Sequence, residues 1–266
     1  MSGDLQFEGR CAVISGAGGG IGGALAREAA RRGMSLALAD LDNARLEAIT
    51  AELRGQGVKV LSRVVDVRDY ASVAPFAEEV LGEFPSIAAT FANAGLLRPS
   101  PAIRPDLDTW NLTIDVNLKG VLHMAKAFAG PMADRGEPAQ FVITGSQVSF
   151  IVGPTLSSYC ATKHALWAYA DIMRMELAME GSALGVSLIC PPRTRSGLTA
   201  ETRARVVAAD GEEAAQHYDT LCMEPADLAA DAFEKVEKRE FWILKAKDHG
   251  PMFRPRVQYL LDVAEN

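Results

Sequence analysis

The chain has 266 residues, of which 48% are hydrophobic and 23% are charged, as expected for a soluble globular protein. A formal net charge of −7 argues against a nucleic-acid-binding surface, which would be basic. The sequence contains no run of about 18 uncharged apolar residues, so we expect no membrane span. The first residues lack the pattern of an export signal. We therefore expect a cytoplasmic protein whose four scattered cysteines stay reduced and bind no structural metal.

The first predicted element is a buried strand over residues 10–15, followed by a glycine-rich stretch and then a helix over residues 24–32. A strand, a glycine turn and a helix in this order form the context that a dinucleotide-binding loop requires. Glycines permit a close approach of the backbone to a pyrophosphate, which then faces the free N–H groups of the helix N-terminus. Because a strand and a helix flank it, the stretch is not interpreted as a flexible linker. The expected cofactor contacts are Gly16, Gly20, Ile21 and Gly22.

A second apolar run, residues 34–39, ends at Asp40. An acidic residue about 20 positions beyond the glycine loop can accept hydrogen bonds from the adenosine ribose hydroxyls and repel a 2′-phosphate. Leu41 follows, where an arginine or lysine would bind that phosphate. This pattern favours NAD over NADP. A competing interpretation is that Asp40 only caps the next helix, expected over residues 43–53.

Strands and helices alternate through the rest of the chain. Further strands are predicted over residues 58–65, 87–92, 140–144, 186–190 and 241–245, and helices over residues 69–84, 110–135 and 226–238, with another long helix opened by Ser157. This alternation predicts a single-domain, doubly wound α/β Rossmann fold, with a parallel seven-stranded sheet and helices on both faces. Residues 197–223 have a helical middle, whereas the tail with Pro251 and Pro255 gives no clear fold signal.

Several polar residues follow the ends of predicted strands. In open α/β sheets, ligands bind outside the carboxyl ends of the strands. We therefore expect one edge of the sheet to bring together the glycine loop, Asp40, Asn93 and Ser146. Asp66 and Val67 close the third predicted strand, and Ala94 and Gly95 follow Asn93 after the fourth.

Tyr159 and Lys163 lie four positions apart in the helix opened by Ser157, so their side chains share one helix face. An ammonium beside a phenol favours the phenolate and should lower the pKa of the tyrosine from its usual value of about 10. Such a tyrosine can exchange a proton with an alcohol or a carbonyl. Alone, however, most Tyr-x-x-x-Lys pairs are ordinary surface neighbours.

In this order, the motifs resemble those of the short-chain dehydrogenase/reductase family. Residues 15–22 are similar to its Thr-Gly-x-x-x-Gly-Ile-Gly loop, with serine in place of threonine, and Asp66 matches its adenine-contacting aspartate. Residues 93–95 match its Asn-Ala-Gly motif, and Ser146 precedes Tyr159 by the usual 13 positions. The positions that match the family's catalytic residues are Asn117, Ser146, Tyr159 and Lys163.

One segment departs from the family pattern. The resemblance predicts Pro-Gly-x-Val-x-Thr after the sixth strand, but residues 191–196 read Pro-Pro-Arg-Thr-Arg-Ser. Pro192 replaces a flexible glycine and fixes φ near about −65°. We interpret this as altered positioning of the nicotinamide or the substrate, with contacts still expected from Pro191, Thr194 and Ser196.

The resemblance implies hydride transfer between NAD(H) and a secondary alcohol or ketone. In it, Tyr159 is the general acid and base, Lys163 lowers its pKa and holds the nicotinamide ribose, and Ser146 bonds the substrate oxygen. Asn117 would hold a water that links Lys163 to solvent. Residues 197–223 would cover a hydrophobic substrate. Gln147 either contacts a second substrate oxygen or points at solvent.

Three other functions fit parts of the sequence less well. A cofactor-sensing protein with little turnover would use the same fold, and Pro192 is the only feature that favours it. An NAD-retaining epimerase or dehydratase would need a longer substrate domain. A serine hydrolase using Ser146 lacks the second glycine of a nucleophile elbow.

Family members are mostly homotetramers or homodimers, so we expect an oligomer. The small and apolar residues of the helix after Tyr159 suit either a subunit interface or an internal core: Ala165, Leu166, Ala168, Ala170 and Met173.

Overall fold

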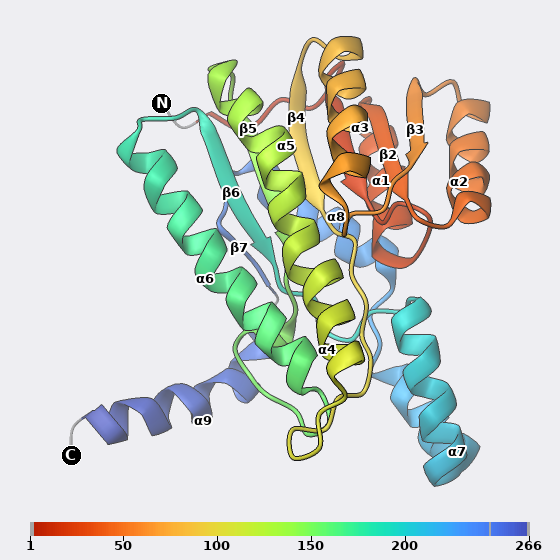
Figure 1. Ribbon diagram of the computed structural model, residues 1–266, viewed down its shortest axis with the longest axis vertical. Coiled ribbons are helices and arrows are strands. Elements are labelled where there is room, and N and C mark those ends of the chain that lie inside the picture. The colour runs from red at the N-terminus through yellow and green to blue at the C-terminus, as the bar shows by residue number, and fades with distance from the viewer. Residues whose placement is uncertain (1–2, 245, 265–266) are drawn as a thin grey trace.

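A computed structural model describes residues 3–244 and 246–264. All strand pairs in it are parallel, and the sheet order is β3-β2-β1-β4-β5-β6-β7 (Figure 1). The described strands are β1 (Cys11–Ser15), β2 (Ser35–Asp40), β3 (Val60–Val64), β4 (Ile87–Ala92), β5 (Ala139–Thr144), β6 (Leu184–Ile189) and β7 (Trp242–Ile243). The predicted doubly wound fold with a seven-stranded parallel sheet is therefore confirmed.

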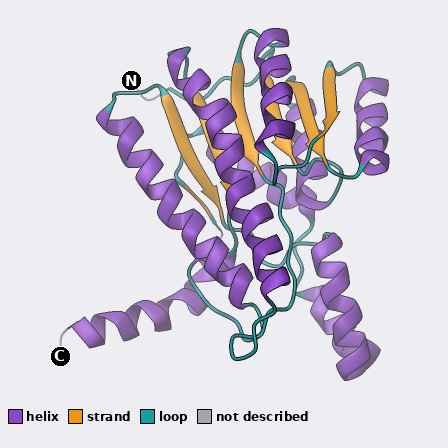
Figure 2. Ribbon diagram, viewed as in Figure 1, coloured by secondary structure: helices purple, strands orange, loops and turns teal. Residues whose placement is uncertain are grey.

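Helices connect the strands and cover both faces of the sheet (Figure 2). Their bounds are α1 (Gly20–Arg31), α2 (Asn43–Gly55), α3 (Tyr70–Glu83), α4 (Leu107–Ile114), α5 (Gly120–Asp134), α6 (Ser157–Met179), α7 (Gly197–Thr220), α8 (Pro225–Glu237) and α9 (Ala246–Ala264). A π-helical segment, Asp115–Lys119, joins α4 to α5, and a short 3-10 turn, Gln147–Ser149, follows β5.

The two faces of the sheet pack into two hydrophobic cores. Along β1, Cys11 and Val13 face a core shared with α3, α5 and α6, whereas Ala12 and Ile14 face a core shared with α1, α2 and α8. Burial on both faces explains why β1 reads as a continuous apolar run rather than an alternating one. All strands run the same way, so their carboxyl ends form one edge, at the bottom of Figures 1 and 2.

The order of the strands reverses between β1 and β4. The chain leaves β1 toward β2 on one side and leaves β4 toward β5 on the other. Connections that diverge in this way leave a crevice at the carboxyl edge, which is where such sheets bind ligands. The glycine loop after β1 and residues 93–95 after β4 border this crevice.

Most predicted elements agree with the structure to within a few residues. The expected helix over 24–32 begins earlier, at Gly20, because the last glycines of the loop already form its first turn. The expected helix over 110–135 is α4, the π-helical segment and α5 in succession. On α6, Leu166, Ala170 and Met173 are buried in the chain's own core, which favours the internal interpretation of that face.

Two C-terminal segments differ more from the sequence analysis. α7 occupies residues 197–220 of the segment 197–223, for which only a helical middle was predicted. The helix has a break at Gly211, whose φ of 84° only glycine adopts easily. The tail forms α9, although each of its two prolines removes a backbone N–H donor. β7 is shorter than the expected 241–245, and Lys245 lies outside the described residues.

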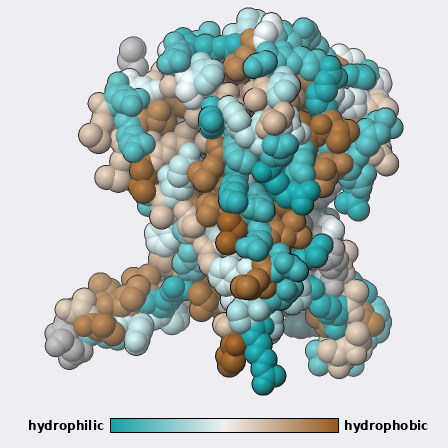
Figure 3. Space-filling model, viewed as in Figure 1, coloured by the Kyte–Doolittle hydropathy of each residue, from teal (hydrophilic) through white to brown (hydrophobic). Residues whose placement is uncertain are grey.

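The described part of the chain contains no helix long and apolar enough to cross a membrane. α9 extends away from the body at the lower left of Figure 1, and Figure 3 shows apolar residues along it. Its Tyr259, Leu260 and Leu261 are each more than half exposed. Near its start, the Phe253 ring packs edge-on against Phe150, with ring centroids 5.4 Å apart.

Candidate active site

The glycine loop after β1 has the backbone that a phosphate-binding turn needs. Gly16 has φ 68°, and a Cβ there would lie 2.9 Å from Cα of Ala94. A Cβ on Gly22 would lie 1.9 Å from the carbonyl oxygen of Gly16. Larger residues therefore cannot replace either glycine without moving the backbone. The loop feeds into the N-terminus of α1 at Gly20, where unpaired N–H groups and the positive end of the helix dipole favour an anion.

Asp40, at the end of β2, anchors this loop. Its Oδ2 accepts a hydrogen bond from Gly18 N at 2.7 Å, and its Oδ1 accepts one from Asp42 N at 2.9 Å. The cap of α2 is Asp42, whose carboxylate accepts from Arg45 N, so the interpretation of Asp40 as the helix cap is wrong. Ionised carboxylates have about four acceptor positions, so Asp40 keeps capacity for ribose hydroxyls. The Leu41 side chain is 61% exposed.

Hydrogen bonds join the ends of β1, β4 and β5. The Ser15 hydroxyl accepts from the backbone N–H groups of Asn93 and Ala94, at 3.0 and 3.1 Å. Asn93 Nδ2 donates to the Ser15 carbonyl at 3.1 Å, and Thr144 Oγ1 donates to Asn93 Oδ1 at 3.2 Å. A Cβ on Gly95 would lie 3.3 Å from Asn117 Oδ1, so the glycine keeps this end of the sheet open to Asn117.

Asp66 follows β3 and pairs with Arg68. Arg68 donates to both carboxylate oxygens, at 2.6 Å between Nη2 and Oδ2, and these bonds lower the pKa of Asp66. Val67 is buried, and its carbonyl lies 2.8 Å from His123 Nδ1. The Asp66 carboxylate is thus ionised and held at the crevice by an arginine that the sequence analysis did not consider.

Ser146, Tyr159 and Lys163 come together at the same edge. Tyr159 lies in the first turn of α6, with the Ser146 side chain close enough to its phenol to favour a lower pKa. Lys163 is 3% exposed; its Nζ donates to the Thr144 carbonyl at 2.7 Å and lies 5.7 Å from the centre of the Tyr159 ring.

Burial dominates the ionisation of this pair. It raises the pKa of Tyr159 to about 12, against a lowering contribution from the Ser146 hydrogen bond. It also lowers the pKa of Lys163 to about 8. The expectation that Lys163 lowers the pKa of Tyr159 is therefore wrong for the chain as it stands, because the ammonium binds the Thr144 carbonyl and its own charge is disfavoured by burial.

Asn117 is fully buried within the π-helical segment, and its amide is fully engaged. Oδ1 accepts from Leu96 N at 2.8 Å, while Nδ2 donates to the Leu96 carbonyl at 2.9 Å and to Thr162 Oγ1 at 3.4 Å. Asn117 therefore fixes the chain that leaves β4 against the helix that carries Tyr159 and Lys163.

Ser149, which the sequence analysis missed, holds the turn that begins at Ser146. Its hydroxyl accepts from Ser146 N at 3.2 Å, while the Ser146 hydroxyl accepts from Val148 N at 3.3 Å. Two serines three positions apart are the sequence signal of such a reciprocal cap. Gln147 between them is partly exposed, and its backbone N–H donates to the Pro191 carbonyl at 3.0 Å.

The segment after β6 packs against the glycine loop. Thr194 is 4% exposed, and its hydroxyl donates to the Pro192 carbonyl at 3.0 Å, so it turns inward. The Ser196 hydroxyl caps α7 by accepting from Thr199 N. A Cβ on Gly20 would lie 2.9 Å from Cβ of Ser196, which places Ser196 beside the phosphate loop. Within the described residues, no three His, Cys, Asp or Glu side chains group as a metal site.

Comparison with known families agrees with this geometry. The chain matches the short chain dehydrogenase family over residues 10–206, and it belongs to that family. It is 34% identical to the 1-deoxy-11-beta-hydroxypentalenate dehydrogenase of Streptomyces avermitilis, over 73% of this chain and 72% of the relative. It is 31% identical to the D-threitol dehydrogenase of Mycolicibacterium smegmatis, over 71% of each chain. The chain is thus a short-chain oxidoreductase, and these relatives give no support to the sensor interpretation.

Solved structures share the whole fold. A short-chain dehydrogenase/reductase from Burkholderia phymatum in complex with NAD superposes with a TM-score of 0.85 at 29% identity, covering 97% of this chain and 95% of that one. The apo form of LigO from a Sphingobium strain superposes with a TM-score of 0.82 at 26% identity, covering 97% and 90%. The similarity to solved structures therefore extends beyond residue 206, into α7, α8 and α9.

Proposed function

We propose that this oxidoreductase transfers a hydride between NAD(H) and a hydrophobic secondary alcohol or ketone. One observation carries the proposal: Tyr159 and Lys163 lie one turn apart on α6, with Nζ 5.7 Å from the centre of the ring, beside Ser146 and at the sheet edge that also carries the glycine loop. The NAD-bound Burkholderia relative supports the choice of cofactor, and the relatives named as dehydrogenases of a hydroxypentalenate and of threitol support the oxidation of an alcohol.

Residues on both sides of the crevice would hold the dinucleotide. Gly16, Gly20, Ile21 and Gly22 would bind the pyrophosphate, and Asp40 the adenosine ribose. The adenine would lie along Asp66 and Val67, and the nicotinamide half along residues 93–95 and 191–196. When bound, the nicotinamide supplies the hydride acceptor or donor. Every other requirement of the reaction falls to the chain.

The proton is handled by Tyr159. In ketone reduction its hydroxyl protonates the oxygen that gains charge, and in alcohol oxidation it removes the hydroxyl proton. Ser146 donates a hydrogen bond to the same substrate oxygen, where charge develops. Lys163, one turn further along α6, would hold the nicotinamide ribose. Asn117 fixes the Leu96 backbone and Thr162, the residue before Lys163 on α6.

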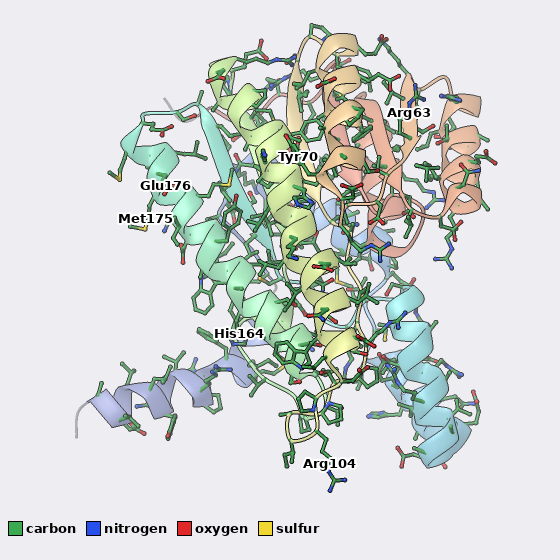
Figure 4. All side chains as sticks on the ribbon, in the orientation of Figure 1. Arg63, Tyr70, Arg104, His164, Met175 and Glu176 are labelled. Carbon is green, nitrogen blue, oxygen red and sulfur yellow. The ribbon has the colours of Figure 1, made fainter. Side chains whose placement is uncertain are left out.

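The substrate would bind beneath α7, with residues 197–223 as its cover. Gln147 borders the site beside Ser146 and is available for a second polar group. The segment 96–106 borders it as well: Ile103 at its tip is 94% exposed, and Arg104 extends into solvent at the bottom of Figure 4.

The first test is fluorescence titration of the purified protein with NADH and then NADPH, followed by turnover of a panel of hydrophobic secondary alcohols. The proposal predicts tighter binding of NADH and turnover of at least one panel member. Binding without turnover of alcohols or the matching ketones would contradict the substrate class. Absence of binding of either nucleotide would overturn the proposal as a whole.

A further inference from the structure

Two loops that border the crevice are joined at a fully buried serine. Ser100 lies in the loop after β4, and Ser157 is the first residue of α6. The Ser100 backbone N–H donates to the Thr155 carbonyl at 2.6 Å, and the Ser100 carbonyl accepts from Ser157 N at 3.0 Å. Ser100 and Leu156 thus form an isolated parallel bridge, and the two loops meet at the bottom of Figure 1.

The hydroxyls of Ser100 and Ser157 complete this contact. Ser157 Oγ donates to the Ser100 carbonyl at 2.6 Å and lies 3.0 Å from Ser100 Oγ. Each hydroxyl has one proton, so the Ser100 hydroxyl is the donor in the second bond. If the Ser157 oxygen were removed, the buried Ser100 hydroxyl would lose this partner, which costs free energy unless the loop moves.

The loop after β4 runs alongside the first two turns of α6. At one end, a Cβ on Gly95 would lie 3.7 Å from Lys163 Nζ, and at the other end Ser100 binds Ser157. Tyr159 lies between Ser157 and Lys163 on α6. The part of the loop between Gly95 and Ser100 therefore passes the turn that carries Tyr159, and it forms a wall of the candidate site.

Hydrogen bonds, rather than chain length, fix the course of this wall. Five extended residues can span about 17 Å, whereas α6 rises only about 9 Å between Ser157 and Lys163. The wall is therefore longer than the distance that it covers, and it can bow away from α6 unless it is held. Asn117 holds its start at Leu96, and Ser157 holds its end at Ser100.

The backbone at this contact is strained. Thr155, whose carbonyl accepts from Ser100 N, has a φ of 61°. This left-handed conformation is disfavoured for a residue with a branched Cβ, and it persists only where the surrounding contacts impose it. The Thr155 side chain is exposed, so it gains little packing in return. Strain of this kind is typical of sites where a defined backbone geometry serves function.

We propose that Ser157 is a positioning residue that determines substrate specificity. Through Ser100 it holds the wall beside Tyr159, and so it sets the space that is available to the substrate. The strained Thr155 contributes by directing its carbonyl at Ser100 N. This inference rests on the proposed function, because it takes the substrate to bind beside Tyr159. None of Ser100, Thr155 and Ser157 is an expected cofactor contact, so loss of the contact should affect the substrate and not NADH.

The test is Ser157→Ala, with Ser157→Thr as the conservative variant that keeps a hydroxyl. For the best substrate of the alcohol panel, KM should rise by about tenfold in Ser157→Ala. The kcat should stay within about twofold of wild type, because a loosened wall weakens the binding of substrate and transition state equally. Ser157→Thr should restore most of the loss. Fluorescence titration should give the wild-type affinity for NADH in both variants.

Ser182→Ala is the matched control. Ser182 follows α6 at its far end, and its hydroxyl accepts from Leu184 N at 3.2 Å, so this change also removes one serine hydrogen bond. If KM in Ser157→Ala is no higher than in Ser182→Ala, or if kcat falls with KM unchanged, the inference is overturned while the proposed function stands. If the wild-type protein turns over no member of the panel, both are overturned.

Two changes at Thr155 provide a second test that does not depend on the folding of Ser157→Ala. Asparagine tolerates a positive φ, whereas proline fixes φ near about −65°. Thr155→Pro should therefore release Ser100 and raise KM as Ser157→Ala does, and Thr155→Asn should retain the KM of wild type. Equal KM values in the two Thr155 variants would contradict the inference.

Discussion

The residues up to 190 and the residues after 190 differ in how firmly they are packed into the fold. In the first part, residues that border the crevice are held by buried hydrogen bonds, as with Ser15, Asn117 and Lys163. In the second part, α7 and α9 expose most of their side chains, and Ala215 is the buried apolar residue that α7 contributes to the described core. The family match, residues 10–206, covers the first part and ends within α7. The difference teaches that the residues bordering the crevice are fixed by packing, whereas α7 and α9 are held to the body by few buried side chains.

The comparison predicts its largest effect at Tyr159. Tyr159→Phe removes the proton donor but retains the ring, so turnover should fall by about 10³-fold with NADH binding nearly intact. Tyr169→Phe, ten residues along α6, removes a hydroxyl from the same helix and should leave turnover close to wild type. Steady-state rates and NADH titration of both variants check this. Comparable rates for the two variants would contradict the role of Tyr159.

Ser146 offers a finer test within the same part. Ser146→Ala should lower turnover by about 10²-fold, because a hydrogen-bond donor to the developing charge is lost. Ser149→Ala removes the reciprocal bond of the same turn and should cost about 1 kcal/mol of stability, with a smaller loss of rate. Rates and urea unfolding are measured for each. A greater rate loss in Ser149→Ala would show that the turn, rather than the Ser146 hydroxyl, matters.

The buried Lys163 predicts a pH dependence of stability. Its pKa is about 8 in the folded chain against 10.5 ordinarily, so between these values the unfolded chain binds more protons, and the free energy of unfolding rises with pH. Relative to Lys163→Met, the wild type should gain up to about 3 kcal/mol between pH 7 and pH 10. Tyr159, with its raised pKa, opposes this gain only above about pH 10. Urea unfolding of both proteins tests the prediction, and Lys238→Met, which removes an exposed lysine, should show no such gain.

The smallest effect is expected in the second part of the chain. In Gly211→Ala, a residue with a side chain must adopt the positive φ of Gly211, which costs about 1–3 kcal/mol. We expect this strain to destabilise α7 at its break. KM for the substrate should rise by several-fold while the affinity for NADH is unchanged. Gly130→Ala, in α5 with no atom near its added Cβ, should leave KM alone. A loss of NADH affinity in Gly211→Ala would break the separation of the two parts.

The sequence predicted the sheet and its edge well, because strand periodicity and the glycine loop are local signals. Asp40, Asn93, Ser146 and Tyr159 lie at the predicted edge for that reason. The helix over the tail was not predicted, because Pro251 and Pro255 oppose an otherwise helical pattern of exposed residues.

Other features depend on contacts between distant parts of the chain. The pKa of Tyr159 depends on burial, which no spacing of residues reveals, and the four-residue separation from Lys163 predicted the opposite direction. Ser196 lies beside Gly20 only because the segment after β6 returns to the glycine loop. Arg68 stands beside Asp66 in the sequence, yet only the coordinates show both carboxylate oxygens engaged by it.

The residues just before and just after α7 are hydrogen-bonded to each other. Thr194 and Met223 form an isolated parallel bridge, in which Arg195 N donates to the Met223 carbonyl at 2.9 Å and Met223 N donates to the Arg193 carbonyl at 2.7 Å. The chain therefore leaves the sheet and returns to it at one point, and the cost of closing this loop depends only weakly on its length. We therefore expect that a segment of different length can replace residues 196–222 between these two points with β6 and α8 left unchanged.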